Sequence, residues 1–159
     1  MSYYIAYGSN LNTRQMAYRC PTAKKLHTAI LEGYSLEFRG REGNAYATIS
    51  PFEDGKVPVL LWEIQAMDEQ RLDLYEGWPR FYRKEMIPVE IEGETREAMV
   101  YIMNGAQDLA MPSGRYWQTV WEGYEENGLD TDVLEVALEK SEWSQESLEQ
   151  KQIDLDMEW

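Results

Sequence analysis

Glu76 has the sequence setting of a buried general base. A helix predicted over 69–76 places Glu76 on one face with Leu72 and Tyr75, since residues three and four apart are neighbours on a helix. Burial on that face, together with the negative end of the helix dipole, would raise the pKa of the carboxyl group. Such a group can accept and return a proton near neutral pH. The alternative is a glutamate that turns to solvent beside Gly77.

The segment Tyr7-Gly8-Ser9-Asn10 is the second feature with chemical potential, because it follows a predicted strand over 2–7. Glycine allows a sharp backbone turn, and the amides that follow can converge on an anion or on a developing oxyanion. The alternative is an ordinary connection between a strand and a helix.

The chain contains one cysteine, Cys20, and one histidine, His27. A catalytic dyad of the two is possible, although a buried thiol and a strand histidine account for them more simply. A single cysteine excludes an internal disulfide, and these two residues are too few for the usual zinc ligand sets. We therefore expect neither a metal nor a cofactor.

Tyr82 and Tyr116 could line a pocket with their hydroxyl groups, or could simply pack in the core. A substrate carboxylate could pair with an arginine, and the sequence does not select among four of them: Arg39, Arg80, Arg83 and Arg115.

The elements that must position these residues are strands followed by helices. A short helix follows Asn12, which has Gln15 three residues later as in a capping pattern; Asp68 is the expected cap of the helix that carries Glu76. The remaining pattern predicts two or three strands over 24–50, an apolar strand over 57–64, a hairpin over 82–103 with its turn at Gly93-Glu94, and helices over 113–128 and 130–140. These elements fit one α+β domain over residues 1–140.

Composition and charge limit the class of function. The chain has 159 residues, 43% of them hydrophobic, and a net charge of -14, which would repel nucleic acids and anionic membranes. No stretch is apolar enough to span a membrane, so we expect a cytoplasmic protein. Residues 141–159 form an acidic appendage, yet they include apolar residues that we expect to dock on the domain: Trp143, Leu148, Ile153, Leu155, Met157 and Trp159.

The ordered set of motifs resembles the gamma-glutamylcyclotransferase family, in the AIG2-like branch that includes gamma-glutamylamine cyclotransferases. The resemblance covers about residues 3–128. It rests on YIAYGSNL at 4–11, ATISP at 47–51, VPVLLWEI at 57–64, LDLYEG at 72–77, Tyr82, and PSGRYWQTVWEGYEENGL at 112–129.

The resemblance implies a small, mostly antiparallel β-barrel with flanking helices. It also implies an enzyme that releases 5-oxoproline from a γ-glutamyl amine or γ-glutamyl amino acid without a cofactor, with Glu76 as the acid/base. The residues that it assigns to substrate binding are Tyr7, Gly8, Ser9, Asn10, Leu11, Tyr82 and Tyr116. The loop differs from that of the glutathione-specific branch, which argues against glutathione. The alternative is a non-catalytic domain that binds a small carboxylate or a peptide on the same scaffold.

Overall fold

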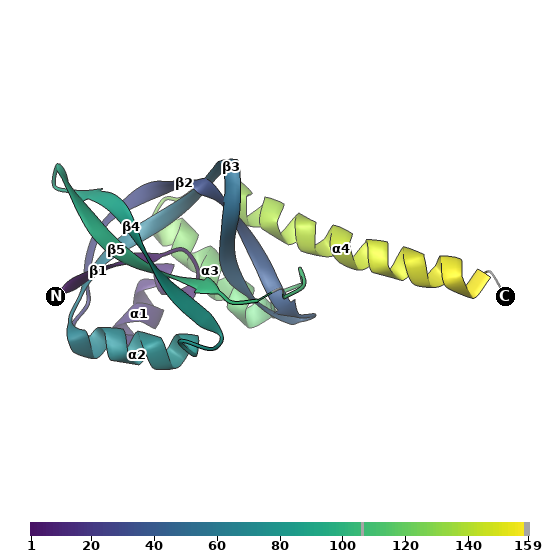
Figure 1. Ribbon diagram of the computed structural model, residues 1–159, viewed down its shortest axis with the longest axis horizontal. Coiled ribbons are helices and arrows are strands. Elements are labelled where there is room, and N and C mark those ends of the chain that lie inside the picture. Colours follow the sequence, from purple (N-terminus) through teal and green to yellow (C-terminus); the bar gives the residue numbers. More distant parts are fainter. Residues whose placement is uncertain (106, 158–159) are drawn as a thin grey trace.

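A five-stranded sheet forms the centre of the molecule (Figure 1). The computed structural model describes residues 1–105 and 107–157. The strands lie in the order β2-β3-β1-β5-β4, and their bounds are β1 Ser2–Ala6, β2 Lys24–Arg41, β3 Asn44–Ile64, β4 Tyr82–Ile91 and β5 Glu94–Met103. The β1–β5 pair is parallel and the other pairs are antiparallel. The segment that leaves β1 therefore starts from the middle of the sheet.

The predicted α+β class is confirmed, and the expected barrel is corrected to an open sheet. Within the described residues β2 and β4 are the edges, and no strand pairing joins them. A second correction concerns β3, which continues through 51–56, where the sequence suggested a break. The register between β2 and β3 shifts between Glu32 and Tyr34, which pair with Lys56 and Pro51. Residues 52–55 of β3 therefore form an irregularity within the long hairpin.

The helices begin and end at residues whose side chains explain them. Their bounds are η1 Ser9–Leu11, α1 Thr13–Arg19, α2 Ala66–Glu76, α3 Gly114–Glu126 and α4 Asp132–Met157. Asn12 caps α1 as predicted, because its side chain accepts a hydrogen bond from the Gln15 amide at 3.2 Å. Helix α2 begins earlier than predicted, because Gln65 and Asp68 form a reciprocal capping box.

The β4–β5 hairpin is where the sequence pattern is clearest. Its strands pair from Tyr82 with Met103 to Ile91 with Glu94. The two turn residues are Glu92 and Gly93, with φ values of 53° and 80°, one position earlier than predicted. Two consecutive positive φ angles match the tight turn that suits the twist of paired strands.

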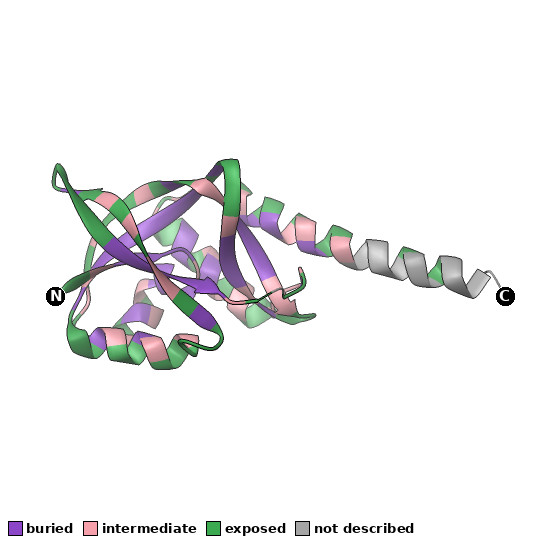
Figure 2. Cartoon of the chain, in the orientation of Figure 1, coloured by how far each residue is buried: buried purple, intermediate pink, exposed green. Residues whose placement is uncertain are grey.

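The core lies between the sheet and the helices, as Figure 2 shows by the burial of each residue. Fully buried side chains include Ile5 of β1, Phe38 of β2, Met99 of β5 and Tyr124 of α3. Strand β1 is short and central, and we call the segment after it, residues 7–11, the first loop. This loop contains η1, which contacts both α1 and α3, and these contacts fix its position.

Helix α4 packs on β2 through its first turns and then projects away from the body (Figure 1). Leu134, Ala137 and Ser141 are buried, and the Ser141 hydroxyl donates to the Phe38 carbonyl at 3.4 Å. The expected docking is wrong for Trp143 and Ile153, which are 67% and 51% exposed. The side chains of Leu148, Leu155 and Met157, and all of Trp159, lie outside the described residues. No described helix has the length and apolarity needed to cross a membrane.

The division into a domain over 1–140 and an appendage over 141–159 stays a prediction. Ending the chain after Ser141 should change the free energy of unfolding by less than about 1 kcal/mol, because surface changes away from the core have small effects. Chemical denaturation measures this change. Ending the chain after Thr131 is the control, since it removes the buried Leu134 and Ala137. An equal loss in the free energy of unfolding for both truncated proteins would contradict the division.

Candidate active site

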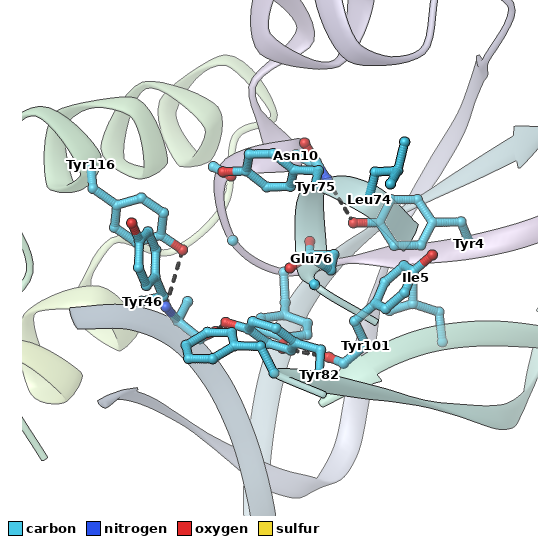
Figure 3. A pocket seen from close by; sticks show the side chains of 16 residues that line it. Tyr4, Ile5, Asn10, Tyr46, Leu74, Tyr75, Glu76, Tyr82, Tyr101 and Tyr116 are labelled. Carbon is cyan, nitrogen blue, oxygen red and sulfur yellow. Dashed lines mark hydrogen bonds between the residues drawn. The ribbon is translucent and has the colours of Figure 1, made fainter. Parts of the chain in front are cut away.

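A cavity of about 260 Å³ lies where the carboxyl end of α2 meets the segment after β1, with walls from β3, β4, β5 and α3 (Figure 3). Its lining is dominated by tyrosines that come from six separate parts of the chain: Tyr4, Tyr7, Tyr46, Tyr75, Tyr82, Tyr101 and Tyr116. The fold thus brings aromatic side chains around one small space.

Glu76 lies in the middle of this lining, as Figure 3 shows. It is the last residue of α2 and partly buried, and Gly77 ends the helix with a φ of 66°. Burial raises the pKa of the Glu76 carboxyl to about 7, and the guanidinium of Arg19 opposes part of the rise. Among the described residues it is the only charged side chain that lines the cavity. A carboxyl group with this pKa can exchange protons near neutral pH.

The first loop supplies three of the cavity's lining residues, Gly8, Ser9 and Asn10. Leu11, which the family resemblance assigned to substrate binding, does not line the cavity, because its side chain is fully buried in the core. The Leu11 amide donates to the Gly8 carbonyl at 3.1 Å, and the Asn12 amide donates to Ser9 at 3.1 Å. The turn thus uses the Leu11 and Asn12 amides, and the Ser9 and Asn10 amides, the first two of η1, take no part in it.

Arg19 fixes the loop from behind, a role that the sequence did not indicate. Its guanidinium donates to Ser9 Oγ at 2.9 Å and to Asn10 Oδ1 at 2.6 Å. It also lies 3.3 Å from the centre of the Tyr75 ring. Arg19 does not line the cavity itself. Through these contacts it joins the first loop to the end of α2.

Tyr82 and Tyr116 both line the cavity, and their hydroxyl groups form hydrogen bonds with the backbone of the same residue, Ala47. Tyr82 donates to the Ala47 carbonyl at 2.7 Å, and the Ala47 amide donates to Tyr116 at 3.0 Å. Tyr7 donates to the Tyr101 carbonyl at 2.6 Å. Burial raises the pKa values of these three tyrosines, so they stay protonated at neutral pH.

Sequence reasoning missed Tyr4, Tyr46 and Tyr101. Asn10 donates to Tyr4 at 2.9 Å, and Tyr101 donates to Asp73 of α2 at 2.6 Å. Tyr101 lies between the apolar residues Val100 and Ile102 of β5. Because side chains alternate between the two faces of a strand, its position opposite these residues was the only available signal. The direction of Tyr4 and Tyr46 depends on strand pairings that the sequence pattern does not specify.

The other candidates from the sequence do not line the cavity. Cys20 is buried, its thiol faces the Asp68 carbonyl, and burial raises the pKa of the thiol to about 11. His27 is exposed and contacts the carbonyl of Thr28. The lining also omits the four arginines Arg39, Arg80, Arg83 and Arg115. In the described part of the chain, no group of three histidine, cysteine or acidic side chains could hold a metal ion.

Comparison with known proteins shows the family of the chain. Residues 4–119 match the family model described as gamma-glutamyl cyclotransferase, AIG2-like. The chain belongs to this family. A mouse gamma-glutamylcyclotransferase is 29% identical over 154 residues, which cover 88% of this chain and 80% of the relative. The human gamma-glutamylcyclotransferase is 29% identical over 142 residues, covering 83% of this chain and 74% of that protein.

A solved structure of a gamma-glutamyl cyclotransferase has the same fold. It superposes with a TM-score of 0.75 and 27% identity, and the match covers 86% of this chain and 85% of that structure. The part of the chain that matches the gamma-glutamyl cyclotransferase family includes the first loop, Glu76 and Tyr116. Helix α4 lies outside the matched range.

Gly8 is predicted to be more sensitive to substitution than Ser9. Its φ of -121° is open to other residues, but a Cβ at this position would lie 3.2 Å from the Tyr116 hydroxyl and 3.3 Å from the Ala47 Cβ. Gly8→Val should therefore displace Tyr116 or the loop, at a cost of about 1–3 kcal/mol in stability and with loss of most activity. Ser9→Ala removes one of the two hydrogen bonds that Arg19 donates to the first loop and should have the smaller effect.

Turnover and thermal unfolding of Gly8→Val and Ser9→Ala, measured side by side, check this order. The reverse order of activity would show that the Ser9 hydroxyl, and not the close packing of the loop, makes the important contact.

Proposed function

We propose that this protein is a cyclotransferase that releases 5-oxoproline from a γ-glutamyl amine or a γ-glutamyl amino acid. Membership of the gamma-glutamyl cyclotransferase family supports the reaction class. The observation that carries the proposal is the position of Glu76, a single carboxyl group with a pKa of about 7 inside a cavity lined by tyrosines. That group has the proton affinity that general acid/base catalysis needs near neutral pH.

The substrate brings its own nucleophile to this reaction. The α-amine of a γ-glutamyl compound can reach the γ-carbonyl carbon by forming a five-membered ring. The attack is intramolecular, and an enzyme that holds the substrate in a folded conformation keeps the α-amine close to the γ-carbonyl carbon, which is a large kinetic advantage. A cavity of about 260 Å³ with rigid aromatic walls suits this task. A nucleophilic side chain is unnecessary, in keeping with the position of Cys20 outside the cavity.

Protons then move between the two nitrogen atoms of the substrate. The Glu76 carboxylate accepts a proton from the α-ammonium, and the free amine attacks the γ-carbonyl carbon. A new C–N bond forms and gives a tetrahedral intermediate. Glu76 delivers a proton to the leaving nitrogen as the original C–N bond breaks. The α-nitrogen loses a second proton as the ring forms, and the released amine takes up a second proton and leaves as an ammonium ion. The two protons lost by the α-nitrogen thus equal the two gained by the leaving amine, and the reaction balances without a co-reactant.

The first loop is the source of stabilisation for the oxyanion of that intermediate. The Ser9 and Asn10 amides take no part in the hydrogen bonds of the turn, and both residues line the cavity with Glu76. Amides fixed in advance stabilise a developing negative charge at little reorganisation cost. Arg19 keeps the loop in place through Ser9 Oγ and Asn10 Oδ1 and adds positive charge behind it.

A panel of γ-glutamyl amides and γ-glutamyl amino acids tests the proposal. The expected result is enzyme-dependent release of 5-oxoproline with an equal amount of free amine from at least one member. Binding of panel members without any release of 5-oxoproline would contradict the proposal and favour the non-catalytic alternative.

A further inference from the structure

The large side chains that line the cavity differ in their exposure. Tyr4, Tyr7, Tyr82 and Tyr101 are buried. Four others are less buried, and we call them the mouth: Tyr46, Leu74, Tyr75 and Phe81. Leu74, Tyr75 and Phe81 are 84%, 43% and 37% exposed, although they are large and apolar. A group of exposed apolar side chains beside a pocket indicates a surface for binding.

The aromatic rings of the mouth are held in fixed orientations. Tyr46 meets Phe81 edge-on, with ring centres 6.3 Å apart and planes at 88°. It meets Tyr116 in the same way at 5.1 Å and 83°. Phe81 also packs against Tyr82 at 5.1 Å. Tyr75 is covered by the Arg19 guanidinium. These contacts give the mouth rigid apolar walls before a substrate arrives.

The residues that line the mouth include no counter-ion for a carboxylate. In the part of the chain that the structure describes, no lysine or arginine lines the cavity. Arg19 is engaged by Ser9, Asn10 and Tyr75. Lys84 is paired with Asp73 at 3.0 Å and lies over the Trp78 ring. The nearest charge inside the cavity is that of Glu76, which repels an anion, as does the net charge of -14.

We propose that the mouth binds the leaving amine, and that it favours γ-glutamyl amides of apolar or aromatic amines over γ-glutamyl amino acids and peptides. This inference rests on the function proposed above. The α-carboxylate of the γ-glutamyl group is common to all of these substrates and does not affect the comparison. An amino acid or peptide brings a second carboxylate, which would lose water at the mouth without gaining a cation. An apolar amine gains contact with Tyr46, Tyr75 and Phe81 instead.

Four γ-glutamyl compounds separate charge from apolar contact. The phenethylamide and the phenylalanine compound differ by one carboxylate, and so do the ethylamide and the alanine compound. Within each class the two members differ by one phenyl ring. Removing the carboxylate should raise kcat/KM for 5-oxoproline release by at least about tenfold. Adding the phenyl ring should raise it by at least about fivefold.

The outcomes of this panel are distinguishable. Equal or higher kcat/KM for the carboxylate-bearing members, with 5-oxoproline formed, would overturn the inference and leave the proposed function intact. Absence of 5-oxoproline from all four compounds would overturn the proposed function, and the inference with it.

Two pairs of variants place the selectivity at the mouth. Leu74→Arg adds a cation at an exposed position and should lower the preference for the phenethylamide over the phenylalanine compound by about threefold. Leu74→Gln is the neutral control and should keep that preference. An equal change in both would overturn the charge argument.

Phe81→Ala should lower the preference for the phenethylamide over the ethylamide by about fivefold, because it removes one wall of the mouth. Phe52→Ala is the matched control, since Phe52 is an exposed phenylalanine outside this cavity. An unchanged preference in Phe81→Ala would overturn the assignment of the aromatic wall.

Discussion

Replacing Glu76 with glutamine is expected to lower turnover by about a hundredfold to ten-thousandfold, the usual contribution of general acid/base catalysis. The amide has nearly the volume of the carboxyl group but cannot carry a proton between the two nitrogen atoms of the substrate. Steady-state release of 5-oxoproline from one substrate, compared between the variant and the natural protein, measures the loss. A variant that keeps half of the activity would contradict the role of Glu76.

The dependence on pH supplies a second readout of the same residue. Glu76 must be a carboxylate to accept a proton, so kcat/KM should rise with pH and level off above its pKa of about 7. The same pKa predicts the effect on stability. Because the folded pKa lies above the ordinary value of 4.5, the folded state binds more protons between these values and loses stability as pH rises through them.

Glu76→Gln should therefore be more stable than the natural protein above pH 7, by about 1–3 kcal/mol, while being far less active. Thermal unfolding at pH 5 and at pH 8 tests this, since the gain should be small at the lower pH. Lower stability of the variant at pH 8 would show that the loss of activity reflects damage to the fold.

Gly123→Ala is expected to disturb the first loop from the opposite side. A Cβ on this residue of α3 would lie 2.7 Å from the Leu11 Cβ and 2.9 Å from the Asn12 nitrogen, closer than packing allows. We expect a loss of about 1–3 kcal/mol in stability from this overlap. The loop that carries Ser9 and Asn10 must also shift, which should lower kcat/KM by at least about tenfold.

Gly114→Ala in the same helix is the matched control. No atom lies within 4 Å of a Cβ at this position, and the residue does not have a positive φ. The same substitution should there be neutral or stabilising by about 0.4–1 kcal/mol. Denaturant unfolding and 5-oxoproline release of the two variants decide between the alternatives. Similar behaviour of both would show that close contact between α3 and the first loop does not matter.

Local features of the fold could be predicted from the sequence because neighbouring residues determine them. The Asn12 cap and the β4–β5 hairpin follow from residues only a few positions apart. The partial burial of Glu76 follows from its position one turn after the buried Leu72, whereas Tyr75, predicted on the same buried face, is 43% exposed. The start of α2 was missed because Gln65 shares the cap with Asp68, and either residue alone fits the pattern.

The composition of the cavity could not be predicted, because it depends on which strands pair. Tyr46 and Tyr101 belong to β3 and β5, and they reach one cavity because β1 lies between these strands in the sheet. Leu11 looked like part of the substrate loop, but the turn of η1 directs it into the core beside Gly123. The bonds of Tyr82 and Tyr116 to Ala47 are likewise long-range.

The central claim is that the α-amine of the substrate, and not water, attacks the γ-carbonyl carbon. The most direct test is turnover of a γ-glutamyl amide in water enriched in the heavy oxygen isotope, with mass analysis of the products. Cyclisation predicts 5-oxoproline that carries no heavy oxygen, since the oxygen of its lactam carbonyl is the original γ-carbonyl oxygen. Glutamate with heavy oxygen in its γ-carboxylate would show hydrolysis and would contradict the account.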